Sequence, residues 1–297
     1  MKIFDCFMFF DEDIILDLRL NILDQYVDHF IIVESIFNHK GEKRNLKFNL
    51  NNYSKFKKKI IYLVYEETSN LINKINLNDS ENDKINKQIL NAYHRENGQR
   101  NYINKGLNLA KDDDLVLISD VDEIPNLKNL KLENIKEKLI FFKQEMFYYK
   151  FNLKLPDKIW TGTRACKKKY LKSPQWLRNI KNRKYPIYRL DTFFSEKKHI
   201  NIKFIENGGW HFTNLKTAEE IKHKLKSYLH HIEYDLNPLT TDEINKIINE
   251  KKAIYDLTAD QRKNKIGTGS KLEIYDNKKL PEYLLKNINK YKNWIEK

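Results

Sequence analysis

Short apolar runs alternate with helix-like segments over residues 1–120, and this alternation constrains the fold more than any other feature of the sequence. Four runs rich in aromatic and β-branched residues predict buried strands, at residues 3–10, 29–35, 59–64 and 115–119. Residues 12–26 and 83–110 carry apolar side chains at helical spacing. Such alternation is typical of a layered α/β domain with a mostly parallel sheet, in which ligands bind at the carboxyl ends of the strands.

The remainder of the chain predicts more strands and then helices. Residues 139–152 form a long aromatic run that predicts one or two strands, and shorter strand-like runs lie at 159–164, 185–190, 200–205 and 210–212. Helices are expected at 218–234, 242–256 and 281–295, the second after a Thr240/Glu243 capping box. We therefore expect a first domain at residues 1–216 and a helical extension at 217–297 packed on it. Residues 266–271 lack the spacing of a phosphate loop and are expected to form a mobile loop or lid.

The charge balance is basic, with 55 lysines and arginines against 41 aspartates and glutamates, a net charge of +14. This charge suits an anionic partner such as nucleic acid, an anionic membrane or a phosphorylated molecule, although a Lys- and Asn-rich composition from AT-rich coding explains it equally well. A 12% aromatic content excludes global disorder. The sequence contains no membrane-spanning apolar stretch and no signal-peptide cleavage site. With only Cys6 and Cys166, both expected to be buried thiols, a soluble cytoplasmic protein is predicted.

Three carboxylates follow the apolar run 115–119, in the segment Ser119-Asp120-Val121-Asp122-Glu123. Carboxylates gathered at a strand end repel one another unless a cation lies among them. In an extended backbone Asp120 and Asp122 share one face, so both can reach one hard divalent ion. The pattern therefore favours a metal site of the kind that bridges a diphosphate, with a solvated acidic turn as the alternative.

Two pairs on the helix-like segment 83–110 could supply positive charge to a ligand. Arg95 and Gln99 are four residues apart, as are Glu96 and Arg100. Arginine guanidinium groups suit a diphosphate. An exposed ion pair of Glu96 with Arg100 is the alternative.

Six ordered segments, the first followed by Glu12, give the chain a family resemblance. They are DCFMFF (5–10), LRL (18–20), VDHFIIVES (27–35), RENGQR (95–100), ISDVDEIP (118–125) and GWHF (209–212). The chain resembles the family 17 glycosyltransferases, known for adding the bisecting N-acetylglucosamine to N-glycans, over roughly residues 3–215. The resemblance implies a GT-A-like nucleotide-sugar-binding fold with a central, mostly parallel mixed sheet flanked by helices. It also implies a UDP-sugar donor, Mn2+ or Mg2+, and inversion at the anomeric carbon.

The resemblance assigns roles to several residues. Asp120 and Asp122 look like the metal-binding Asp-x-Asp pair, with Asp122 as the direct ligand and Asp120 nearer the donor ribose or the metal waters, and His211 as a further ligand. For His211 a structural histidine is the alternative.

The donor nucleotide would meet other parts of the matching segments. Glu34 and Ser35 fall where such folds meet the uracil and ribose, unless they simply cap a strand. Arg95, Gln99 and Arg100 would bind the diphosphate.

The remaining assignments concern the sugar and the catalytic base. Trp160, in a family-like segment, would stack on a sugar ring or pack in the core. Inverting transfer needs a base, and Glu206 and Glu145 are candidates by position only.

The expected activity is transfer of a sugar, first of all N-acetylglucosamine, from a UDP-sugar to a glycan, glycolipid or glycoprotein acceptor. The better-known family members carry an N-terminal membrane anchor, and this chain starts at its first strand, so their acceptor does not carry over. The alternatives are a basic nucleic-acid-binding protein or metal-dependent nuclease, and a non-catalytic sugar-binding relative. Nucleic acid is not the expected partner, and the Lys-rich extension leaves room for peripheral contact with an anionic membrane.

Overall fold

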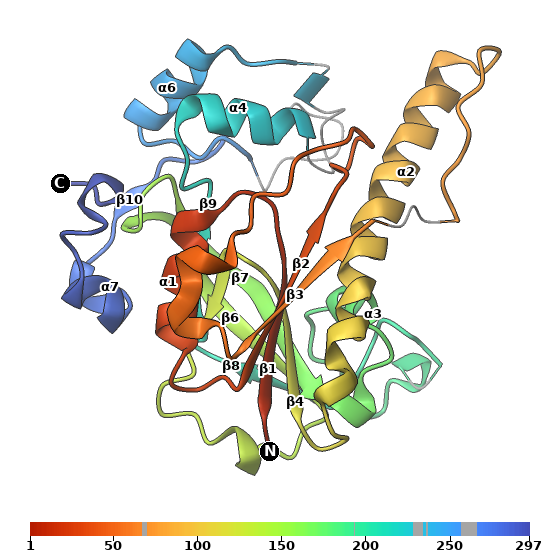
Figure 1. Ribbon diagram of the computed structural model, residues 1–297, viewed down its shortest axis with the longest axis vertical. Coiled ribbons are helices and arrows are strands. Elements are labelled where there is room, and N and C mark those ends of the chain that lie inside the picture. The colour runs from red at the N-terminus through yellow and green to blue at the C-terminus, as the bar shows by residue number, and fades with distance from the viewer. Residues whose placement is uncertain (67–69, 193, 228–233, 236, 257–265) are drawn as a thin grey trace.

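A curled mixed sheet forms the centre of the protein and helices cover it on both sides (Figure 1). The computed structural model describes residues 1–297 except 67–69, 193, 228–233, 236 and 257–265. The strands follow the order β3-β2-β1-β4-β7-β6-β9-β5, with β8 beside β6 and β10 beside β7. Their bounds are β1 Ile3–Phe9, β2 His29–Ser35, β3 Ile60–Tyr65, β4 Leu115–Asp120, β5 Glu123–Pro125, β6 Leu139–Tyr148, β7 Leu153–Lys167, β8 Ile202–Ile205, β9 Gly209–Thr213 and β10 Glu273–Ile274.

Strands β3, β2, β1 and β4 form the parallel half of the sheet, as the alternating pattern predicts. Strand β1 lies between β2 and β4, with Cys6 opposite Ile31 on one side and Ile118 on the other. Both cysteines are buried, as expected. The parallel pairing brings the carboxyl ends of these strands to one edge of the sheet, where ligands bind in folds of this type.

The second half of the sheet is mixed and is built on two long strands. Strand β7 runs antiparallel to both β4 and β6, and the short strands β8 and β9 lie parallel to β6. The run at 159–164 is therefore only the middle of β7. The prediction of a strand at residues 185–190 is wrong: these residues form a loop and a turn with exposed apolar side chains, which have no sheet to pack on.

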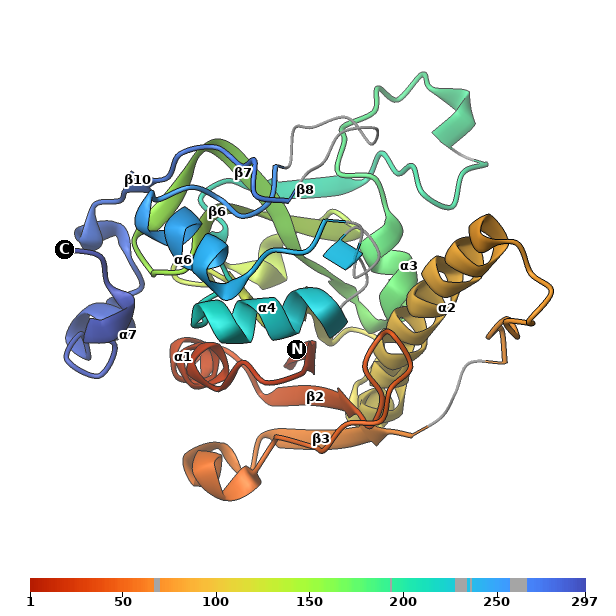
Figure 2. The same cartoon turned by 90° about the horizontal axis from the view of Figure 1, so that it is seen from above.

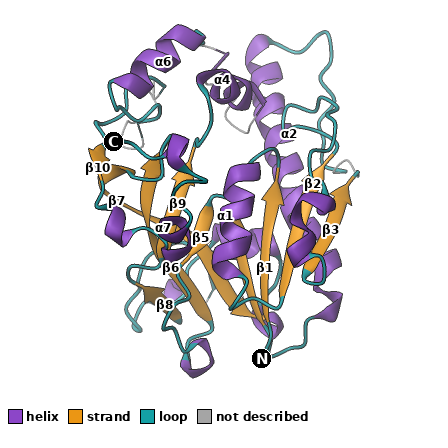
Figure 3. Cartoon of the chain, turned by 60° about the vertical axis from the view of Figure 1, so that its left-hand side comes forward, coloured by secondary structure: helices purple, strands orange, loops and turns teal. Residues whose placement is uncertain are grey.

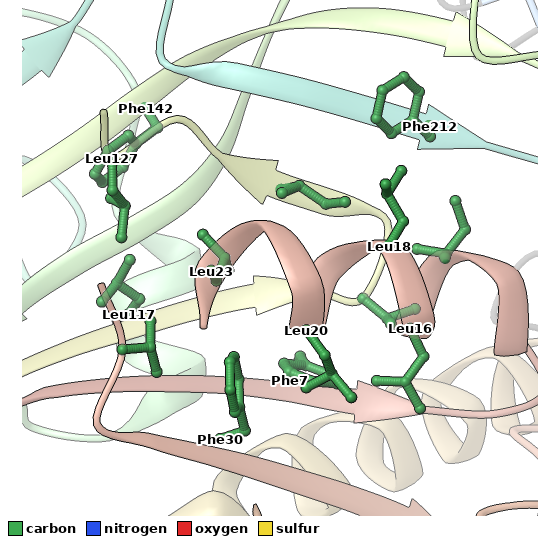
Figure 4. Close-up of a cluster of buried hydrophobic side chains, with 14 of the residues drawn as sticks. Phe7, Leu16, Leu18, Leu20, Leu23, Phe30, Leu117, Leu127, Phe142 and Phe212 are labelled. Carbon is green, nitrogen blue, oxygen red and sulfur yellow. The ribbon is translucent and has the colours of Figure 1, made fainter. Parts of the chain in front are cut away.

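The helix α1 (Asp13–Leu23) lies against the parallel strands and anchors the largest core cluster. Figure 4 shows Leu16 and Leu20 of α1 directed toward Phe7 and Leu18 toward Phe212. The opposite side of the sheet carries α2 (Glu81–Asn101) and the short α3 (Pro174–Asn179).

The predicted helix at 83–110 is only partly α-helical. Its last part, Tyr102–Leu109, winds as a tighter 3₁₀ helix. A Cβ on Gly106 of this stretch would lie 2.8 Å from the Ile31 side chain, so the glycine permits close packing on β2.

The helices described after residue 217 are α4 (Ala218–Ser227), α6 (Thr241–Asn249) and α7 (Glu282–Lys286), followed by a 3₁₀ turn at Lys292–Trp294. Of these, α6 and α7 are shorter than predicted. The predicted helix 218–234 extends into residues 228–233, which lie outside the described residues. The Thr240/Glu243 capping box is present, but α6 does not reach residue 256 because Lys251 adopts a left-handed backbone with φ of 53°.

The described parts of this C-terminal region are packed on the sheet. Strand β10 pairs with β7, and α4 and α6 share a core cluster with Tyr148. Residues 266–271, expected to be mobile, lie between two bridges, Tyr255 to Ile266 and Lys252 to Lys271. The side chain of Ile266 is buried.

This arrangement confirms the expected GT-A-like α/β fold: a curled central mixed sheet flanked by helices (Figure 3). Among the described residues, helices of the length and apolar character needed to cross a membrane are absent.

Candidate active site

A pocket of about 440 Å³ opens at the carboxyl ends of the parallel strands. Met8 and Phe9 of β1, Ser35 of β2 and Asp120 of β4 line it from below, and α2 forms one wall. The opposite wall comes from α4 and residues 254–255. Figure 2 shows α4 lying over the middle of the molecule, between α1 and α2. The position is the one at which parallel α/β sheets bind ligands.

The acidic segment after β4 is fixed by a buried arginine on α1. Arg19 forms a two-pronged ion pair with Asp5 of β1, at 2.6 and 2.8 Å, and neither side chain is exposed. The same guanidinium donates to the backbone carbonyls of Asp120, Val121 and Glu123 at 3.2, 3.2 and 2.7 Å. Because one guanidinium binds all three carbonyls, it fixes the backbone conformation of the segment that carries the carboxylates.

Two arginines hold the side chain of Asp120. Its Oδ1 accepts from Arg100 of α2 and its Oδ2 from Arg178 of α3, both at 3.0 Å. Glu96 accepts from the same Arg100 at 2.7 Å. Burial acts to raise the pKa of Asp120, but the guanidinium groups of Arg178 and Arg100 outweigh it and lower the pKa well below its usual value. Asp120 is therefore ionised, with both oxygens engaged by cations.

Glu123 is fully buried and links Arg178 to Trp160. Arg178 donates to both carboxylate oxygens of Glu123, at 2.7 and 2.9 Å, and the indole of Trp160 donates to Oε1 at 2.7 Å. The Trp160 ring lies 5.2 Å from the ring of His211 and lines the pocket. The tryptophan is thus held by a hydrogen bond at its polar end and offers an aromatic surface to a ligand.

Asp122 faces His211 across the pocket lining. The short strand β5 pairs with β9 so that Glu123 lies opposite His211, and this register brings the imidazole Nε2 to 3.4 Å from Asp122 Oδ1. Burial acts to lower the pKa of His211, but Asp122 raises it above its usual value. For the carboxylate of Asp122 burial acts in the opposite direction and raises the pKa, but His211 and Lys224 outweigh it and hold the pKa below its usual value. An ionised carboxylate and an imidazole therefore lie side by side in the pocket lining.

This pair fits a divalent ion whose other ligands come from a substrate. A carboxylate oxygen and an imidazole nitrogen are ordinary ligands of Mn2+ and related ions. Among the residues that the structure describes, however, histidine, cysteine and acidic side chains do not gather in groups of three or more that could hold a metal by themselves. Ions of this type are commonly held by one or two protein groups plus substrate phosphates. The donors present are therefore suited to an ion that arrives with a phosphorylated ligand.

Most of the residues proposed from the sequence meet in this pocket. They are Ser35, Gln99, Arg100, Asp120, Asp122, Trp160 and His211.

Glu34 and Arg95 are not part of the pocket lining. Glu34 is fully buried and forms an ion pair with Arg44 at 3.0 Å. It also accepts hydrogen bonds from the Tyr62 hydroxyl at 2.9 Å and from the backbone amides of residues 47 and 48. These four partners hold Glu34 inside the protein, as expected of a structural residue. Arg95 donates to the carbonyl of His39 at 3.0 Å and lies under the neighbouring loop.

Neither glutamate proposed as the catalytic base lines the pocket. Glu145 forms an ion pair with Lys154, and Glu206 forms an exposed one with Lys143, each at 2.7 Å.

Four residues of the site were not identified from the sequence. Arg178 reaches Asp120 from α3, a six-residue helix without any recognisable motif. Arg44 and Lys224 line the pocket from segments that read only as basic surface. Glu12 follows the family-like N-terminal segment 5–10, but nothing in its spacing suggested a role.

Glu12 has an unusual environment in the pocket lining. Its Oε2 accepts from the backbone amides of Phe10 and Asp11, each at 3.1 Å. No hydrogen-bond partner for its Oε1 is found in the described part of the chain. The carboxylate is therefore oriented by the backbone while one oxygen remains available.

A family model described as "Glycosyltransferase family 17" matches residues 1–295. A search of curated proteins finds no match to the chain.

Proposed function

This chain belongs to glycosyltransferase family 17 and is therefore a glycosyltransferase, and on that premise we propose that it transfers a sugar from a UDP-sugar donor to a glycan acceptor with inversion at the anomeric carbon. N-acetylglucosamine is the first sugar to test. The observation that carries the proposal is the pair Asp122–His211 beside the Arg-bound Asp120, in a pocket at the carboxyl ends of β1, β2 and β4.

The pocket offers suitable groups for each part of such a donor. Ser35 and Gln99 lie on the β2 side, where a uridine would find polar partners. We therefore assign Gln99 to the nucleoside and not to the diphosphate, for which the resemblance had suggested it. Asp122, His211 and the cationic Lys224 lie on the side that would take the diphosphate. The aromatic ring of Trp160 is available to a sugar ring.

Asp122 and His211 would hold the divalent ion. When bound, such an ion neutralises the charge that develops on the departing diphosphate. The protein's own contribution is the fixed backbone of residues 120–123, which Arg19 holds in place before any ligand arrives. The pocket would therefore recognise metal and diphosphate together.

Glu12 is our candidate for the base that removes the proton from the acceptor hydroxyl. Among the described residues, the carboxylates that line the pocket are Glu12, Glu96, Asp120 and Asp122. The carboxylates of Glu96 and Asp120 are bound by arginine side chains, and His211 faces Asp122. Glu12 is held by backbone amides and keeps one oxygen available, so it can accept a proton without breaking an ion pair.

Calorimetry of UDP binding with and without Mn2+ tests the donor and metal proposals. We expect binding that depends on the metal and is lost in Asp122→Ala. Asp113→Ala is the matched control, because Asp113 is an exposed carboxylate that pairs with Lys167 and Lys169. UDP binding that ignores the metal, or that survives in Asp122→Ala, contradicts the metal proposal. Absence of UDP binding together with salt-sensitive binding of RNA or DNA would favour the nucleic-acid alternative.

Turnover separates an active transferase from a sugar-binding relative. Donor hydrolysis or transfer should be measurable with the intact protein, and Glu12→Gln should lower kcat by about 10²–10⁴-fold while UDP binding is kept. A kcat unchanged in Glu12→Gln removes Glu12 from the mechanism.

A further inference from the structure

The described residues of the segment 181–199, which are all but 193, form a closed loop that projects from the body of the protein between α3 and β8. Its two ends are tied together: the amide of Lys181 donates to the carbonyl of Lys197 at 2.7 Å. The Trp176 indole, on α3, donates to the carbonyl of Glu196 at 3.1 Å. Figure 2 shows the loop extending beyond the sheet and helices at the upper right. Because its base is fixed, the loop presents its outer residues in a defined place.

The outer part of this loop carries large apolar side chains in water. Ile187, Tyr188, Leu190 and Phe194 are 79, 81, 72 and 91% exposed. Single exposed apolar side chains are common on soluble proteins, but four within eight residues form a concentrated apolar surface. Such a surface indicates contact with another apolar phase or partner.

Positive charge surrounds these apolar residues. Residues 181–199 contain six lysines and arginines against two acids, a net charge of 6 − 2 = +4. Asp191, one of the two acids, is already paired with Arg189 and Lys198. Arg183 and Lys184 have no acidic partner among the described residues and are exposed. The loop therefore combines unpaired cations with apolar side chains.

We propose that this loop docks the enzyme on an anionic lipid surface, with the apolar side chains entering the interface and the cations facing lipid phosphates. Interfacial membrane binding requires this pairing of apolar insertion with attraction to anionic head groups. Two of the four apolar residues, Ile187 and Leu190, are aliphatic, which favours lipid over the aromatic stacking expected of a single-stranded nucleic-acid site.

The loop follows closely in sequence on a residue that holds the acidic segment of the site. Arg178, which binds Asp120 and Glu123, precedes the loop by only three positions along the chain. Docking of the loop would therefore bring the enzyme to the membrane surface, where a lipid-linked acceptor is found. This last consequence rests on the proposed transferase function; the docking itself does not.

Vesicle sedimentation tests the proposal with the full-length protein. We expect binding to vesicles of phosphatidylcholine and phosphatidylserine in equal parts, weakened by salt, and little binding to phosphatidylcholine alone. The double variants Ile187→Ser/Leu190→Ser and Arg183→Glu/Lys184→Glu should each weaken binding by about tenfold or more, since each cation near such a surface contributes substantially.

Matched variants elsewhere on the surface serve as controls. Leu77→Ser removes an apolar side chain that is 98% exposed on a different part of the chain, and Lys278→Glu/Lys279→Glu reverses two adjacent exposed lysines. Both controls should bind vesicles as the unchanged protein does. UDP binding by all variants shows that the fold is intact, and separates failure of docking from failure of the donor site.

Three results would overturn the proposal. The first is a lack of binding to anionic vesicles by the unchanged protein. The second is equal binding by the loop variants and the controls, which would mean that total charge alone attracts the protein. The third is loop-dependent binding of RNA or of a protein without any vesicle binding.

Discussion

Replacing Arg19 by methionine should destabilise the protein more than any change at its surface. Arg19 and Asp5 are both fully buried, and the guanidinium also donates to three backbone carbonyls and to the Ser119 hydroxyl. Methionine fills part of the same volume but carries no donor. The variant leaves Asp5 as an uncompensated charge inside the core.

The size of the effect follows from these contacts. Removing one partner of a buried ion pair costs about 3–5 kcal/mol. The carbonyls of Asp120 and Val121 lose a donor, at about 1 kcal/mol each, whereas that of Glu123 keeps the Thr163 hydroxyl at 2.9 Å. The sum is about 5–7 kcal/mol, a large part of the ~5–15 kcal/mol by which folded domains are stable. With about 2 °C per kcal/mol for a chain of this size, Tm should fall by roughly 10–14 °C.

Thermal unfolding followed by circular dichroism measures this shift. The double variant Asp5→Asn/Arg19→Met should recover about 3 kcal/mol, because the buried charge is gone while the loop contacts remain lost. Arg189→Met is the matched control: Arg189 also pairs with an aspartate, but at the surface, so Tm should not change measurably. A fall in Tm of less than about 2 °C in Arg19→Met would refute the view that Arg19 holds the acidic segment in place.

Three further changes test other parts of the structure. Gly209→Ala should lower Tm by several degrees, because residue 209 has a φ of 133° and an added Cβ would lie 2.1 Å from a carbonyl of β5; an unchanged Tm would show that β9 can shift. Burial raises the pKa of Cys166 to about 12 and that of Cys6 well above its usual value. Both thiols should therefore react with Ellman's reagent at pH 8 only after unfolding, and in the native protein Cys166 should react at least about a thousandfold more slowly than a free thiol. Rapid labelling of the native protein would contradict their burial. Trp160→Phe, which keeps an aromatic ring but loses the 2.7 Å hydrogen bond to Glu123, should weaken donor turnover by about 10-fold or less and Trp160→Ala by more; equal losses in both would mean that the hydrogen bond, not the ring, matters.

The local sequence pattern was sufficient to predict a strand where the segment is buried on all sides. The run at residues 29–35 has a continuous apolar centre at 30–33, and β2 has the predicted bounds. The same kind of pattern was wrong at residues 185–190, because apolar residues on an exposed loop resemble those of a strand when only the sequence is read. Helix ends were predicted less well, since Lys251 ends α6 through a backbone conformation that lysine rarely adopts.

The candidate site was predictable where it lies on one segment and not where it depends on distant partners. Asp120 and Asp122 stand at a strand end and could be proposed from their spacing. Glu34 also stands at a strand end, but its carboxylate binds the backbone amides of residues 47 and 48. The local sequence around Glu34 does not reveal these partners. Arg178 reaches Asp120 across 58 positions of sequence, and so depended on the fold for its discovery.

The pocket is assembled from both ends of the chain, and this has a consequence for biosynthesis. Met8 and Glu12 are among the first residues to leave the ribosome, whereas His211, Lys224 and Tyr255 are made only when most of the chain exists. Pairings of such separation form slowly, because a long stretch of chain must be ordered before they are gained. A nascent chain that has passed β4 already carries its acidic segment but lacks the histidine that faces it. Donor binding should therefore appear as a late event of folding, and it offers a direct signal that synthesis has reached the last third of the protein.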